Sequence, residues 1–174
     1  IAVPEGMKLK DKFYQVQEAS EFGKLNGWHM YVDPTGGGAN GDEIAYAITG
    51  MIAGRVFLAD CGGRPGGWTD DMYDWLTAVA LKWKPKCISI EKNYGNGALA
   101  SIWLPKLKVA FDKEHIKWPG IDEVWETGQK ELRIIDILEP MIGAGKLVIY
   151  DGLIEKDWQL CQRYPTELRE VYSL

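Results

Sequence analysis

Acidic residues close two stretches of the chain that are expected to be strands. WHMYVD ends at Asp33, and KCISIE ends at Glu91. Because an acid at the end of a sheet strand points into the crevice beyond the sheet edge, acids from two strands can meet there. Asp42 begins the next strand and is placed to approach the same crevice. Carboxylate oxygens suit hard divalent cations, and two ions roughly 3.5–4 Å apart can drive phosphodiester hydrolysis.

The glycine-rich loop at 34–42 fits two other kinds of site poorly. A phosphate-binding loop needs a lysine followed by Ser or Thr, between a strand and a helix, and this loop has no lysine. A calcium loop that started at Asp33 would need a glutamate at its twelfth position, where the chain has Ile44. A strand-end metal ligand is the interpretation that remains.

A plain structural interpretation also fits these residues. Asp-Pro followed by glycines is a common surface turn, and a strand that ends in Glu is ordinary. Taken singly, each acid is more often solvated than catalytic. The residues alone leave both interpretations open.

Composition sets broad limits on the class of protein. The chain has 174 residues, 46% hydrophobic and 26% charged, which is typical of one globular domain. No apolar run approaches the roughly 20 residues that span a bilayer. The net charge of −5 counts against a nucleic-acid binder. Acids gathered around metal ions would nevertheless lower the formal charge while the cation site itself attracts phosphate. Cys61, Cys87 and Cys161 form no C-x-x-C pair, which argues against zinc or a disulfide framework.

The elements expected to position the acids alternate along the chain. Three short-spaced strands predict an antiparallel meander, and helices and strands alternate after it. Helices are expected from 70, over 97–112 and over 128–142, and the last is expected to face Leu132, Ile135, Leu138 and Ile142 inward. The pattern predicts a mixed α/β sheet with helices on its faces.

Four stretches, running together from about residue 28 to the end of the chain, resemble the nuclease domain of the large terminase subunit of short-tailed, podovirus-type bacteriophages. They are DPTGGGANGDEIAYAI (33–48), FLADCGGRPGGWTDD (57–71), ISIEKNYGNGAL (88–99) and GQKELRIIDILEPMIGAGKLVIYD (128–151). The fourth stretch is the most specific, because no general rule about helices predicts it.

The resemblance implies a ribonuclease H-like fold, with a mixed sheet of five or slightly more strands and helices on both faces. It implies a metal-dependent endonuclease that cuts double-stranded concatemeric DNA when viral genome packaging starts and ends. Asp33 and Glu91 then correspond to ligands of two Mg²⁺ or Mn²⁺ ions, and Asp42 to an auxiliary acid.

The resemblance also carries a departure. The family's third catalytic aspartate lies in a His-Asp-Asp stretch on a later helix, and this chain stops at Leu174. We expect residues 27–174 to be a nuclease domain without its C-terminal helix, and 1–26 to be an extension or a linker from an upstream ATPase domain. Asp151 and Asp157 are not expected to replace the third acid.

Positive side chains near these motifs are candidates for DNA contact. Lys130 and Arg133 share one helix turn, and Lys92 follows Glu91, so all three are placed to meet backbone phosphate. A solvated helix face is the alternative for the first two. The resemblance implies double-stranded DNA, the upstream ATPase domain, the small terminase subunit and the portal as partners. It implies no membrane, and a place in the host cytoplasm and transiently at the portal vertex.

Two other functions stay open. An actin- or sugar-kinase-like ATPase half-domain also begins with a strand, an aspartate and glycines, but such a protein needs a second lobe. A catalytically inactive docking module of the packaging motor would keep the fold without tight metal binding. His29 and His115 are the only histidines, and both are expected to be structural or on the surface, so no Ser-His-Asp or Cys-His grouping is predicted.

Overall fold

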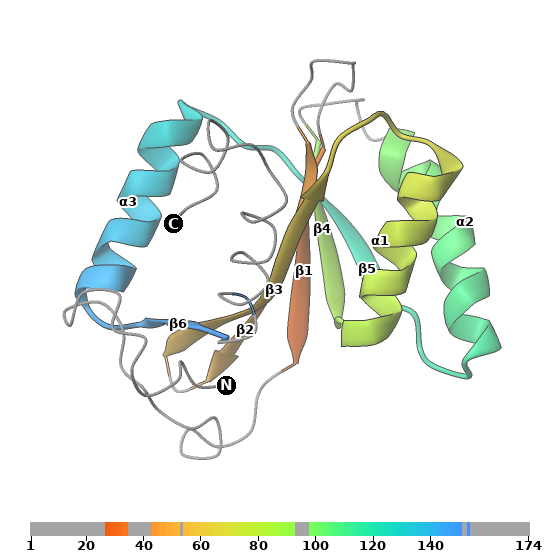
Figure 1. Cartoon of the computed structure of the whole chain (residues 1–174), viewed down its shortest axis with the longest axis horizontal. Coiled ribbons are helices and arrows are strands. Elements are labelled where there is room, and N and C mark those ends of the chain that lie inside the picture. The colour runs from red at the N-terminus through yellow and green to blue at the C-terminus, as the bar shows by residue number, and fades with distance from the viewer. Residues whose placement is uncertain (1–26, 35–42, 53, 93–97, 151–152, 154–174) are drawn as a thin grey trace, which may run out of the picture.

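Six strands form one mixed sheet in this computed structural model, which describes residues 27–34, 43–52, 54–92, 98–150 and 153 (Figure 1). The order across the sheet is β5-β4-β1-β2-β3-β6. The strands are β1 (Trp28–Asp33), β2 (Ile44–Ile52), β3 (Arg55–Arg64), β4 (Cys87–Glu91), β5 (Gly120–Val124) and β6 (Leu147–Ile149). The mixed α/β sheet is confirmed, and it has six strands.

The expected antiparallel meander is present. β1 pairs antiparallel with β2, and β2 pairs antiparallel with β3. The remaining pairs, β1 with β4, β4 with β5 and β3 with β6, are parallel. β1 therefore lies in the middle of the sheet, and the carboxyl ends of β1, β3, β4 and β5 share one edge.

Helices α1 (Asp70–Trp83) and α2 (Ala98–Lys113) cover one face of the sheet (Figure 1). Met30 and Val32 on β1 are fully buried in the core on this face, together with Trp103 of α2. The Trp103 Nε1 donates a hydrogen bond of 2.9 Å to Thr77 Oγ1 of α1. This bond satisfies a buried indole N–H and ties the two helices together.

Helix α1 begins where the sequence predicts. Thr69 has an extended backbone, and its Oγ1 accepts a hydrogen bond of 3.4 Å from the Met72 N–H. The helix continues to Trp83 and ends where Lys84 adopts a left-handed conformation with φ 49°. Because Lys84 breaks the helix without a glycine, its end was not visible from composition.

Helix α3 (Lys130–Gly143) lies on the opposite side of the sheet from α1 and α2 (Figure 1). Leu132 and Ile135 are 54% and 51% exposed, and Leu138 is also exposed. The prediction that these side chains face inward is wrong for the part of the chain that the structure describes. Helical periodicity identifies an apolar stripe, but it does not supply an element to cover it. Among the described helices, none combines the length and the apolar character needed to cross a bilayer.

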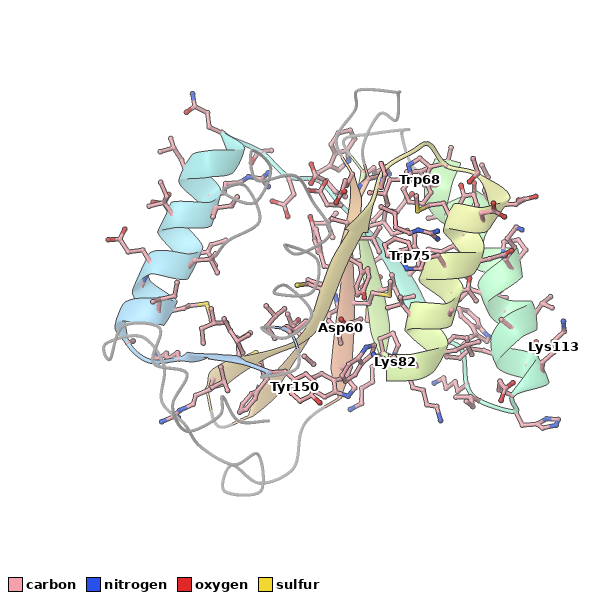
Figure 2. The ribbon with its side chains drawn as sticks, viewed as in Figure 1. Asp60, Trp68, Trp75, Lys82, Lys113 and Tyr150 are labelled. Atoms are coloured by element: carbon pink, nitrogen blue, oxygen red, sulfur yellow. The ribbon has the colours of Figure 1, made fainter. Side chains whose placement is uncertain are left out.

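A β-bulge interrupts the pairing of β2 with β3. Leu58 pairs with Thr49 and Asp60 pairs with Ile48, so Ala59 is an extra residue. The bulge turns Asp60 to the helix-covered face, where it is only 6% exposed. Its Oδ2 accepts a hydrogen bond of 2.8 Å from Trp83 Nε1. It also accepts one of 3.3 Å from Lys82 Nζ, and Figure 2 labels both Asp60 and Lys82. The carboxylate is therefore a satisfied structural group.

Candidate metal centre

Asp33 and Glu91 occupy equivalent positions on two neighbouring parallel strands. The register of β1 with β4 pairs Val32 with Ile90, and each acid is the next residue of its strand. Neighbouring strands lie about 4.8 Å apart. The register therefore brings the two predicted acids together at the carboxyl edge of the sheet.

Both side chains also project from the same face. Along β1, Met30 and Val32 point to the helix core, so His29, Tyr31 and Asp33 point to the other face. On β4, Ser89 lies on that second face, because its Oγ is 2.9 Å from His29 Nε2. Glu91 follows Ser89 by two residues and shares its face.

Tyr31 lies directly below this acid pair and connects it to a third carboxylate. Its hydroxyl donates a long hydrogen bond of 3.4 Å to Glu126 Oε1. Burial raises the pKa of the Tyr31 hydroxyl above its ordinary value. The negative charges of Glu126, Glu91 and Asp33 raise this pKa further, in that order, which places all three carboxylates around the phenol.

Glu43 adds a fourth acid on the same face. Asp33 pairs with Ala45, and Ala45 pairs with Gly63, so all three lie on the second face at this edge. A Cβ on Gly63 would meet the Glu43 carboxylate. The absence of a side chain at Gly63 is therefore what leaves room for Glu43 to lie there.

The donor set fits a hard divalent cation. Asp33 and Glu91 offer only carboxylate oxygens, which Mg²⁺ and Mn²⁺ prefer over sulfur or nitrogen ligands. Within the described ranges, no three His, Cys, Asp or Glu side chains gather closely enough to hold a metal ion. The described centre is thus a pair of carboxylates, and the predicted acid Asp42 lies outside the described residues.

The predicted DNA-contacting side chains differ in their surroundings. Lys92 Nζ lies 3.4 Å from Glu123 Oε2, and Glu123 pairs with the core residue Ile90, so Lys92 is on the helix-covered side. Arg133 forms an ion pair with Glu126. Lys130 begins α3, and its side chain lies outside the described part.

Further from the edge, the same face carries a second polar group. Cys87 Sγ donates a hydrogen bond of 3.1 Å to Asp122 Oδ2. Burial raises the pKa of the Cys87 thiol to about 11, with help from the hydrogen bond and the charge of Asp122. Burial lowers the pKa of His29, and Asp122 partly opposes that shift. These groups favour a neutral thiol and a neutral imidazole, which suits structural roles.

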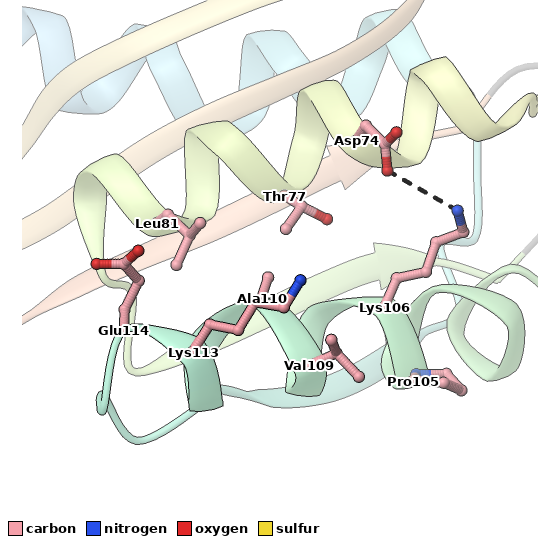
Figure 3. A pocket seen from close by; sticks show the side chains of 9 residues that line it. All are labelled: Asp74, Thr77, Leu81, Pro105, Lys106, Val109, Ala110, Lys113 and Glu114. Carbon is pink, nitrogen blue, oxygen red and sulfur yellow. Dashed lines mark ion pairs between the residues drawn. The ribbon is translucent and has the colours of Figure 1, made fainter.

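A groove of about 500 Å³ lies between α1 and α2 (Figure 3). Both helices cover the face of the sheet opposite to the acid pair. Its walls are Leu81, Pro105, Val109 and Ala110, with charged groups at its rim. Lys106 Nζ lies 3.1 Å from Asp70 Oδ1 and 3.8 Å from Asp74 Oδ1. The groove contains no convergent acids and is distinct from the candidate metal centre.

Sequence reasoning missed three residues around the centre, although it held a signal for each. Tyr31 is two residues from Asp33, so strand alternation places both on one face. Glu126 comes two residues after β5 ends at Val124, so it is an acid just beyond a strand end, whereas Asp33 and Glu91 are strand-end residues themselves. Glu43 is adjacent to the predicted Asp42, and the alternation of β2 gives Glu43 the face of Asp33.

Comparisons with known proteins identify the family of this chain. The family described as Terminase Bacteriophage T7, Ribonuclease H-like domain matches residues 32–147. The large terminase subunit of Enterobacteria phage T3 is 35% identical over 145 residues, which cover 83% of this chain and 23% of the relative. The chain thus spans about a quarter of the length of that relative.

Solved structures with the same fold include the human cytomegalovirus terminase nuclease domain. Its Mn-soaked, inhibitor-bound form superposes with a TM-score of 0.52 at 9% identity, over 76% of this chain and 68% of that one. The Mn-soaked form gives a TM-score of 0.52 at 10% identity, over 76% of this chain and 66% of that one. At such low identity the likeness concerns the fold alone.

Proposed function

This chain belongs to the family of ribonuclease H-like domains of phage T7-type terminases, and from that membership we propose that it is a metal-dependent DNA endonuclease. One observation carries the proposal. Asp33 and Glu91 end adjacent parallel strands on the same face of the sheet, where two carboxylates can share hard cations. Asp42 is proposed as an auxiliary acid of the same centre.

The chain's own residues would act as ligands in this reaction. Asp33 and Glu91 must be ionised to hold Mg²⁺ or Mn²⁺, and they need not attack the substrate themselves. When bound, two such ions would lower the pKa of a water and stabilise the departing 3′ oxygen of a phosphodiester. Their position on strands fixes the carboxylates more firmly than loops would.

The substrate and partners follow from the family. We propose double-stranded concatemeric DNA as the substrate, cut when genome packaging starts and ends. Lys92, Lys130 and Arg133 remain proposed contacts to backbone phosphate, which requires only positive charge. An ATPase domain of the same protein, the small terminase subunit and the portal are the proposed partners. The proposed location is the host cytoplasm, with a transient stay at the portal vertex.

Plasmid cleavage tests the proposal. We expect nicking and linearisation in Mn²⁺ that stop on addition of EDTA and are absent in Asp33→Asn. Asp112→Asn is a matched control, because Asp112 is an exposed aspartate on α2, away from the acid pair. Cleavage by Asp33→Asn at the wild-type rate would refute the assignment. Silence of the wild-type chain and of a longer form would favour an inactive docking module.

A further inference from the structure

We propose that Tyr31 is a positioning residue for the acid pair, held in place by Glu126 and Arg133. This inference rests on the proposed metal-dependent function and deepens it. The three residues come from β1, from the segment after β5 and from the first turn of α3. Their contacts form one side-chain relay, Arg133–Glu126–Tyr31, from α3 to the strand that carries Asp33.

The position of this relay in the sheet explains how it reaches the acid pair. β4 lies between β1 and β5 in the sheet, so the hydrogen bond from Tyr31 to Glu126 must pass over β4. It passes on the face of Ser89 and Glu91, because Tyr31 pairs with Ser89. The phenol therefore lies next to the Glu91 side chain on this face and restricts the conformations open to its carboxylate.

The end of the relay that lies furthest from Asp33 is held by an ion pair. Glu126 Oε2 accepts from Arg133 Nη1, and the two side chains are only 28% and 26% exposed. A partly buried pair of this kind is less screened by solvent than a surface pair. The Arg133 backbone N–H also donates 3.1 Å to Gln129 O, which fixes the first turn of α3. Tyr31 is thus held from outside the sheet.

A positioning role and a simple charge effect predict opposite results for Arg133. If Arg133 acted only through its charge, Arg133→Met would raise the affinity of the acid pair for a cation, because a positive charge is lost. If Arg133 acts by holding Glu126 and Tyr31, the same change loosens the carboxylates and lowers that affinity. The sign of the change therefore separates the two explanations.

The experiment measures Mn²⁺ binding to the full chain by isothermal titration calorimetry, without DNA. We expect Tyr31→Phe and Arg133→Met each to weaken Mn²⁺ binding by about tenfold, the lower end of the range for outer partners of metal ligands. The double variant should lose little more Mn²⁺ affinity than either single variant, because both changes interrupt the same relay of contacts. Arg133→Lys keeps the charge and a donor, and should recover part of the affinity.

Two controls match these changes. Tyr46→Phe also removes a phenol hydroxyl that is hydrogen-bonded to a carboxylate, that of Asp60, but on the helix-covered face. Arg64→Met removes a positive charge at the same edge, where Arg64 packs over Trp75 with 5.4 Å to the ring centroid. Neither control should weaken Mn²⁺ binding.

The outcomes distinguish this inference from the proposed function. Wild-type affinity in Tyr31→Phe, or tighter binding in Arg133→Met, would overturn the positioning role while leaving the metal centre intact. Absence of binding in the wild-type chain, with Asp33→Asn indistinguishable from it, would overturn the proposed function itself.

Discussion

Asp33 and Glu91 each follow the last paired residues of two neighbouring parallel strands, and both project from the face that α1 and α2 leave uncovered. This relationship joins two residues that are distant in the sequence into one pair of oxygen donors. Its value lies in the rigidity of the strands, because neither carboxylate depends on a loop for its position.

The first prediction concerns metal-linked stability. Mn²⁺ at about a hundredfold excess over its dissociation constant should stabilise the wild-type chain by about 2.7 kcal/mol, since the cation binds only the folded pair. Glu91→Gln should lose this gain while keeping its cooperative unfolding. Urea unfolding with Mn²⁺ or with EDTA measures both. A Mn²⁺-dependent gain that persists in Glu91→Gln would contradict the pairing of the two acids in one centre.

The second prediction concerns the buried carboxylate of Asp60. Asp60→Ala should lower the free energy of unfolding by about 2–3 kcal/mol, because Trp83 Nε1 loses its acceptor and Lys82 loses its partner. Chemical denaturation measures the change. Asp136→Ala is the comparison, since Asp136 is exposed on α3 and should change stability by less than about 0.5 kcal/mol. Equal effects of the two changes would show that Asp60 is not a structural anchor.

The third prediction is a pH dependence that originates at His29. Burial lowers the pKa of His29 in the folded chain below its unfolded value of 6.5. The unfolded chain therefore takes up this proton first as the pH falls. The contribution of His29 to the free energy of unfolding is complete above pH 6.5. It is lost as the pH falls from there toward the pKa of His29 in the folded chain.

Unfolding measured from pH 7.5 to pH 5.5 should show this loss in the wild type, and a shallower slope in His29→Gln. Both proteins share every other titrating group, so acids elsewhere cancel in the comparison. Identical slopes would mean that the imidazole is not held neutral by burial.

The fourth prediction concerns the reactivity of Cys87. With a pKa of about 11, the thiol is almost wholly protonated at pH 8, so alkylation by iodoacetamide should be slow. Asp122→Asn removes a carboxylate that favours the protonated thiol, and should speed the reaction. Peptide mass spectrometry after timed alkylation follows Cys87 separately from Cys61. Slower alkylation in Asp122→Asn would disprove the role given to that carboxylate.

Sequence patterns predicted the elements that carry the acids because those elements obey local rules. The strand that ends at Asp33 and the helix that begins at residue 70 both follow from such patterns. The contact from Tyr31 to Glu126 joins residues 95 positions apart, and it exists only because β5 and β1 flank β4. No local pattern contains that order, so the strand-then-acid signal at Glu126 could be seen but not assigned a neighbour.

The cover of α3 was unpredictable for a related reason. Its apolar stripe was clear, yet Leu132 and Ile135 are exposed in the described part of the chain. Periodicity reports what a helix can bury, and the partner is a property of the whole fold. The domain limits at 1–26 and 27–174 stay predictions, since the first segment lies outside the described residues.

The single extra residue in β3 places Asp60 on the opposite face of the sheet from Asp33. Regular alternation through Ala59 would send the Asp60 side chain to the side that holds Asp33, and the bulge sends it to Lys82 and Trp83 instead. A ladder that paired Ala59 regularly with Ile48 would therefore add a negative charge to the face of the two candidate ligands and leave the Trp83 indole without its acceptor. The irregular pairing keeps this carboxylate as an internal hydrogen-bond acceptor and out of competition for a cation.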